Sequence, residues 1–182
     1  MAEATAPSAS RRRDRFWADL TGASDRWGRT ILYGLLLSRV SLAPLLILVV
    51  LLHGAATGDW TGPGSIENFS GRIDQVDAGR ILSAVIAAPL LETLLLVLLV
   101  GGIGFRLKAG RWATATFTGL AFIPLHGLGF GSLVVFPFFV LMAVVWYNWK
   151  QRGDGLGGFW IVVSLHAVAN GSALFTSALF VN

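Results

Sequence analysis

The sequence predicts an all-α, polytopic transmembrane helical bundle with about five membrane helices. Apolar residues make up 54% of the 182 positions and charged residues only 13%, and the mean hydropathy is +0.68. A soluble domain would carry more charge. The chain has no cysteine, which excludes disulfides, thiolate metal sites and a cysteine nucleophile.

The N-terminal segment 1–29 is polar and basic, and it contains Arg11-Arg12-Arg13. It lacks the short apolar region of a cleavable signal. We therefore expect a mostly disordered, cytoplasmic tail before a transmembrane domain at 30–182. The arginines would orient the first helix, or rest on anionic lipid.

Two apolar stretches follow, each long enough to cross a core of about 30 Å. The first, 30–53, is interrupted by Arg39, and the second, 81–105, contains one charge, Glu92. Snorkelling or pairing with the tail is favoured for Arg39 over contact with Glu92. The intervening segment 54–79 is expected to be a solvated outer loop.

Residues 112–147 carry no formal charge and as one helix would be roughly 54 Å long. They must fold back, and the glycine-rich run 126–132, just after Pro124, is the expected turn. The arms 112–125 and 132–147 are short for a membrane core, so the turn should lie below the outer surface and bring His126 inward. A last apolar span covers 156–181.

Basic residues indicate the orientation of the chain in a cell membrane. With a cytoplasmic N-terminus, most of them fall inside, as the positive-inside rule requires, and tryptophans fall at the same boundary. The inner basic residues are Arg11, Arg12, Arg13, Arg15, Arg26, Arg29, Arg106, Lys108, Arg111, Lys150 and Arg152, whereas Arg72 and Arg80 lie outside. The boundary tryptophans are Trp27, Trp112, Trp146, Trp149 and Trp160.

Three ionisable side chains lie inside apolar sequence: Glu92, His126 and His166. Such groups are costly in hydrocarbon, so a functional site facing the protein interior is their default interpretation. His166 and Asn170 are four residues apart and share a helix face. By helical rise, Glu92 and His166 both lie near mid-membrane.

One carboxylate and two imidazoles permit two chemistries. Glu92, His126 and His166 could hold a divalent metal with a water, or the carboxylate could activate water directly while the imidazoles stabilise charge. A carboxylate used as a metal ligand would leave no second buried carboxylate as base, so the metal-free option, with no cofactor, is favoured. The HExxH zinc motif and a nucleophile-elbow serine are both absent from the sequence.

Three short motifs occur in order on separate predicted spans: Pro89-Leu90-Leu91-Glu92-Thr93, Phe122-Ile123-Pro124-Leu125-His126 and His166-Ala167-Val168-Ala169-Asn170. They resemble the EExxxR, FxxxH and HxxxN motifs of the CPBP (Abi) family. That family includes CAAX prenyl proteases and bacteriocin-processing or immunity proteins. The resemblance covers about residues 80–182.

The resemblance implies an intramembrane endopeptidase of the glutamate type. Glu92 would activate water, His126 would help to hold it, and His166 and Asn170 would stabilise the oxyanion. The chain departs from the first motif at Thr93, where a second glutamate is common, and at Val97, where the motif has arginine. Prenylated substrates are therefore not assumed.

Other functions stay open. The chain could be a catalytically weak immunity or scaffold protein that binds a membrane partner, or a small proton-coupled transport subunit with Glu92 as carrier. The polar groups could also be interhelical hydrogen-bond donors and acceptors, or could cap the glycine turn. The expected partners are the lipid bilayer and a membrane-associated peptide or protein substrate, and no nucleic acid.

Overall fold

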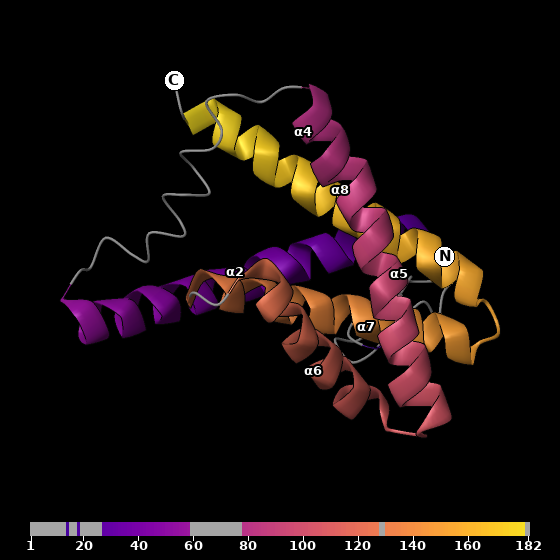
Figure 1. The fold of residues 1–182 in the computed structure, drawn as a ribbon. Helices are drawn as coiled ribbons and strands as arrows, with labels where there is room; N and C mark the ends of the chain where they lie inside the picture. Colours follow the sequence, from indigo (N-terminus) through magenta and orange to yellow (C-terminus); the bar gives the residue numbers. More distant parts are fainter. Residues whose placement is uncertain (1–13, 15–17, 19–26, 59–77, 128–129, 181–182) are drawn as a thin grey trace, which may run out of the picture.

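The computed structural model describes residues 14, 18, 27–58, 78–127 and 130–180, and every regular element within them is a helix (Figure 1). In chain order the elements are α2 (Trp27–Thr57), α4 (Ala78–Leu82), the π-helix η1 (Ser83–Ala87), α5 (Ala88–Val100), the π-helix η2 (Gly101–Arg106), α6 (Arg111–Phe122), the 3-10 helices η3 (Pro124–His126) and η4 (Phe130–Val134), α7 (Val135–Gln151) and α8 (Gly155–Phe180). The predicted tail 1–29 and outer loop 54–79 lie largely outside the described residues.

Three helical stretches within the described residues are long and apolar enough to cross a membrane: Ser83–Arg106, Ser132–Gln151 and Gly155–Phe175. They support the prediction of an α-helical membrane protein. The helix α6 has 12 residues and is about 18 Å long, shorter than a bilayer core of about 30 Å.

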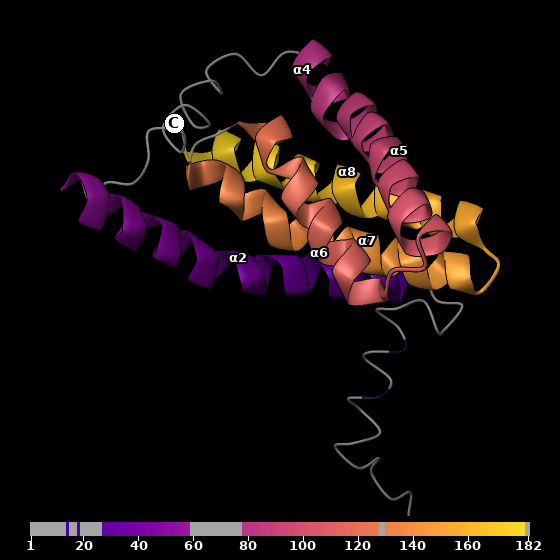
Figure 2. The same cartoon turned by 60° about the horizontal axis from the view of Figure 1, so that its bottom comes forward.

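Helix α7 is the centre of the bundle. In the most apolar 18-residue stretch of Ser132–Gln151, 61% is buried inside the bundle. The corresponding shares are 22% for Ser83–Arg106 and 28% for Gly155–Phe175. Helices α2, α5, α6 and α8 pack around it (Figures 1 and 2). A helix that is apolar on all sides is stable when other helices cover it. Leu91, Leu94 and Leu98 of α5 point outward, where hydrocarbon would surround them.

The fold-back between α6 and α7 begins earlier than the sequence analysis predicts. The arm 112–125 was expected to be helical, but α6 ends at Phe122. Pro124 has no N–H to donate to the preceding turn, and the chain continues as a 3-10 turn in which the His126 N–H donates to Ile123 O. At Gly127, φ is +112°, a conformation that favours glycine.

One end of the bundle collects the start of α2, the η2–α6 link and the α7–α8 link (Figure 2). Trp27 of α2 packs edge-on against Trp149 of α7, with ring centroids 6.1 Å apart. Arg111 donates to Asn148 Oδ1 at 3.0 Å across the α6–α7 interface. The basic residues at this end are Arg29, Arg106, Lys108, Arg111, Lys150 and Arg152. The sequence analysis assigns these residues to one side of a membrane, and the ends of the elements that carry them share this end of the bundle.

Among the described residues, the hydrogen-bond partners of Arg39 lie on α8. Its Nη2 donates to the Ala169 carbonyl at 3.2 Å and to the Ser172 hydroxyl. Both acceptors belong to α8. An arginine in the middle of an apolar helix therefore ties α2 to α8, while the predicted pairing with the tail lies outside the described residues.

Candidate active site

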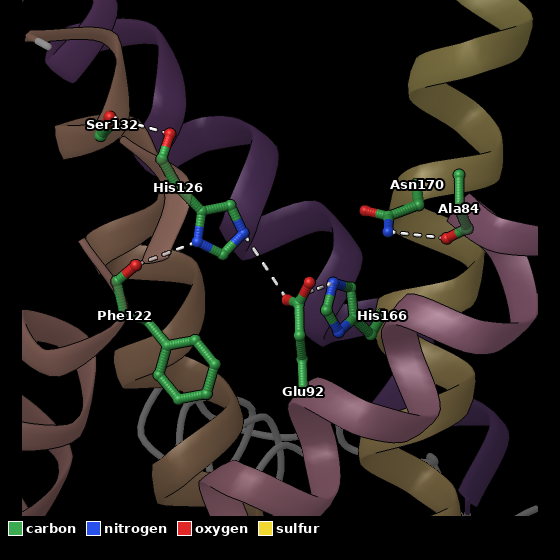
Figure 3. Close-up of polar contacts among 7 residues, drawn as sticks. All are labelled: Ala84, Glu92, Phe122, His126, Ser132, His166 and Asn170. Atoms are coloured by element: carbon green, nitrogen blue, oxygen red, sulfur yellow. Dashed lines mark hydrogen bonds and ion pairs between the residues drawn. The ribbon is translucent and has the colours of Figure 1, made fainter. Parts of the chain in front are cut away.

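The structure brings Glu92, His126 and His166 together from three different elements (Figure 3). Glu92 lies on α5, His126 ends η3, and His166 lies on α8. Each imidazole Nε2 is 3.6 Å from the same carboxylate oxygen, Glu92 Oε2. That separation is longer than a direct hydrogen bond and short enough for one water molecule to contact both groups.

The three side chains differ in their access to the surroundings. His166 is 4% exposed, whereas Glu92 and His126 are 27% and 29% exposed. Oε2 of Glu92 is itself buried and accepts no hydrogen bond from any described residue. The site is therefore closed on the α8 side and open beside Glu92 and His126.

His126 is held in one tautomer by the local fold. Its Nδ1 lies 2.9 Å from the Phe122 carbonyl one turn earlier. Because a carbonyl only accepts, Nδ1 carries the hydrogen in the neutral ring, and Nε2 presents a lone pair to Glu92. The Ser132 hydroxyl donates to the His126 carbonyl at 3.2 Å, which fixes the backbone around the Gly127 turn.

The surroundings of His166 favour the other neutral tautomer, with the hydrogen on Nε2. Its Nδ1 is buried and has no hydrogen-bond partner among the described residues, and its ring packs edge-on against Phe138 and Phe139 at 5.4 and 5.6 Å. The neutral tautomer that faces a carboxylate favourably carries its hydrogen on Nε2. With both rings neutral, Glu92 lies between the N–H of His166 and the Nε2 lone pair of His126.

Phe139 of α7 is a site residue that the sequence analysis missed. Its ring lies 5.3 Å from the His126 ring and 5.6 Å from the His166 ring, and it stacks on Phe122 with centroids 3.8 Å apart. Both phenylalanines are at most 1% exposed. Phe139 thus limits the rotation of both imidazoles, and only its place in an apolar run could have suggested it.

Asn170 shares the face of α8 that carries His166, but its amide nitrogen points elsewhere (Figure 3). Nδ2 donates to the Ala84 carbonyl of η1 at 2.8 Å. An amide has two N–H groups, so this bond leaves the second for another acceptor. No described contact joins Asn170 directly to Glu92.

The two departures from the family motif lie one turn apart on α5. Thr93 is fully buried and Val97 packs against the apolar core. A glutamate at 93 without an arginine at 97 would leave an unpaired buried charge. The two neutral residues therefore form a compatible pair.

The described side chains include no group of three His, Cys, Asp or Glu residues arranged to hold a metal ion. The Nε2 atoms of His126 and His166 each lie 3.6 Å from the same carboxylate oxygen.

The fold and the site define a helical membrane protein with a carboxylate–imidazole centre inside the bundle. Comparison of the chain with protein-family models, with curated proteins and with solved structures found no match.

Proposed function

We propose that this chain is an intramembrane endopeptidase, of the kind that the CPBP-like motifs imply, in which Glu92 activates water to hydrolyse a peptide bond. The proposal includes five helices embedded in the cell membrane and a cytoplasmic N-terminus. One observation carries it: a single buried carboxylate oxygen lies 3.6 Å from an imidazole on each side. A polar cluster of this kind in apolar surroundings is costly unless it has a function.

The two tautomers suggest how water would be oriented. A water beside Glu92 can donate one hydrogen to the carboxylate and the other to the Nε2 lone pair of His126. Its own lone pairs then face away from both groups, toward a substrate carbonyl. Glu92 is the general base in this arrangement, and His126 is the group that holds the water in line.

The reaction then proceeds through a tetrahedral intermediate. The water oxygen bonds to the carbonyl carbon while its proton passes to Glu92. The developing oxyanion accepts hydrogen bonds from the N–H of His166 and from the second amide hydrogen of Asn170. The C–N bond breaks, and the proton on Glu92 moves to the leaving amine, so that the products are a carboxylic acid and an amine.

The expected substrate is a membrane-associated peptide or protein. The surroundings of the site are apolar, and the large exposed residues Leu91 and Leu125 are neighbours of Glu92 and His126 in the sequence. A substrate that reaches this site must place its scissile bond inside the hydrocarbon layer or at its edge. Nothing in the proposal requires a prenyl group.

Hydrolysis can be tested before the substrate is known. The purified full chain in liposomes is incubated with membrane peptides in water enriched in ¹⁸O, and new C-termini are read by mass spectrometry. Each hydrolysed bond incorporates one ¹⁸O from solvent. We expect labelled products with the parent chain and a loss of about 10²-fold or more with Glu92→Gln, because the amide is no longer a base.

The matched control is Asp154→Asn. Asp154 Oδ1 accepts the Gly157 N–H at 2.8 Å at the start of α8, and asparagine preserves such a cap. This variant removes one carboxylate far from the site and should give the parent pattern of products. Equal labelling by the parent chain and by Glu92→Gln would exclude Glu92 as the base.

A second candidate is a binding protein with the same fold and weak or absent catalysis. One observation favours it: an N–H group of Asn170 that the family pattern would direct to substrate is bonded to Ala84 instead. A protein of this kind would give no ¹⁸O-labelled product with either the parent chain or Glu92→Gln.

A further inference from the structure

The carbonyl of Ala84 lacks the backbone donor that a helical register would normally provide. Ala84 belongs to the π-helix η1, where the Ala88 N–H donates to Ser83 O. In an α-helix that N–H would serve Ala84 O. In the π-register the donor would be residue 89, and Pro89 has no N–H. Neither register therefore supplies a backbone donor to Ala84.

Asn170 supplies the missing donor from another helix. Its Nδ2 is 2.8 Å from Ala84 O, across 86 positions of sequence. An unpaired backbone carbonyl inside a bilayer is costly, and a proline in a membrane helix is tolerated where a neighbouring side chain satisfies the freed group. Pro89 thus leaves the Ala84 carbonyl without a backbone donor, and Asn170 supplies a side-chain donor in its place.

This bond joins the two segments that carry the site. Glu92 is three residues after Pro89 on α5, and His166 is one turn before Asn170 on α8. The helices approach closely beside the bond, since a Cβ built on Gly171 would lie 3.8 Å from Val85 Cγ2. A slip of one helical turn would move Glu92 by about 5.4 Å relative to His166.

We propose that Asn170 is a positioning residue: its amide replaces the backbone hydrogen bond that Pro89 removes, and so fixes the register that keeps Glu92 opposite His166. The bond itself does not depend on hydrolysis. Its consequence for catalysis rests on the proposed function. The following experiment uses no substrate, so its failure leaves the peptidase proposal standing.

The first measurement is a double-mutant cycle on the full chain in detergent, read as the midpoint of thermal unfolding. Asn170→Ala should lower the midpoint in the parent chain. In the Pro89→Ala background the segment can close as a regular helix in which Ala88 donates to Ala84, so the same change should lower the midpoint much less. An equal loss in both backgrounds would overturn the proposal.

Asn148→Ala is the matched control. Asn148 also joins two helices, through the bond from Arg111 at 3.0 Å, but it lies on α7 at the basic end of the bundle. Its loss should therefore be the same with Pro89 and with Ala at position 89. If the loss caused by Asn148→Ala differs between Pro89 and Ala at position 89, then Pro89→Ala weakens the bundle generally. That result would contradict a specific coupling between Asn170 and Pro89.

A second measurement reads the register in native membranes and needs no purified protein. The chain has no cysteine, so the pair Val85→Cys and Gly171→Cys reports on α8 and η1 alone. Oxidative cross-linking should be fast in the parent background, at least several-fold slower with Asn170→Ala, and restored when Pro89→Ala is added. Cross-linking at the same rate in all three backgrounds would contradict a register-setting role.

Discussion

At the scale of single residues, the environment of Glu92 is asymmetric. Nδ1 of His126 lies against Phe122 O, so in the neutral ring Nε2 faces the carboxylate with a lone pair. His166 packs among aromatic rings, and its neutral tautomer with the hydrogen on Nε2 is the one that faces the carboxylate favourably. Two imidazoles of the same chemical type can therefore have different roles, one orienting water and the other supplying positive potential.

The buried Thr93 and the half-buried Val97 give a prediction at the same scale. Thr93→Glu alone should lower the free energy of unfolding by about 3 kcal/mol or more, since it buries an unpaired charge. Adding Val97→Arg, one turn away, should recover part of that loss. Thermal unfolding in detergent is the measurement. A double variant no more stable than Thr93→Glu would show that the two positions do not face a common space.

At the scale of elements, the sequence predicted the convergence of Glu92, His126 and His166 better than it predicted the helices that carry them. The length of the apolar stretches indicated the membrane-length helices. The ionisable residues inside those stretches, Glu92, His126 and His166, are the side chains that converge. The π-helices Ser83–Ala87 and Gly101–Arg106 were not predictable, because periodicity does not distinguish them from α-helix.

Contacts that depend on tertiary packing were also beyond prediction. The bond of Asn170 to Ala84, the ties from Arg39 to α8 and the place of Phe139 between two imidazoles arise only when distant helices meet. Residue type and spacing carry no information on which neighbour will satisfy a given carbonyl. The early end of α6 is a partial exception, since Pro124 is visible in the sequence.

The α6–α7 contact gives a prediction for an element interface. A Cβ on Gly119 would lie 2.6 Å from Val140 Cγ2 and 3.0 Å from Phe136 O. Gly119→Ala should therefore separate the two helices and cost about 1–3 kcal/mol of stability. Gly102→Ala is the control, since a Cβ there meets no atom within 4 Å. If both variants unfold at the parent temperature, the close approach of α6 to α7 is wrong.

At the scale of the whole molecule, basic and aromatic residues mark one end of the bundle. Arg29, Lys108, Arg111 and Arg152 lie at the end where the α7–α8 link meets the η2–α6 link (Figure 2). Arg152 also lies over the Trp149 ring, 5.5 Å from its centroid. Basic and aromatic residues together are typical of a cytoplasmic membrane boundary.

Topology follows as a prediction that the cysteine-free chain makes easy to test. Lys108→Cys and Arg152→Cys should react with a membrane-impermeant maleimide only from the cytoplasmic face. Ala56→Cys, exposed near the end of α2, should react only from the opposite face. Labelling of Lys108→Cys and Arg152→Cys from different faces would contradict the shared basic end.

The most direct test of the central claim is a double-mutant cycle on hydrolysis of a substrate identified by ¹⁸O labelling. Glu92→Gln removes the base, and His126→Phe keeps an aromatic ring without its nitrogens. If both residues hold the same water, each variant should lower kcat/KM by about 10²–10⁴-fold and the double variant should fall little further. Losses that multiply in the double variant would show that Glu92 and His126 act independently.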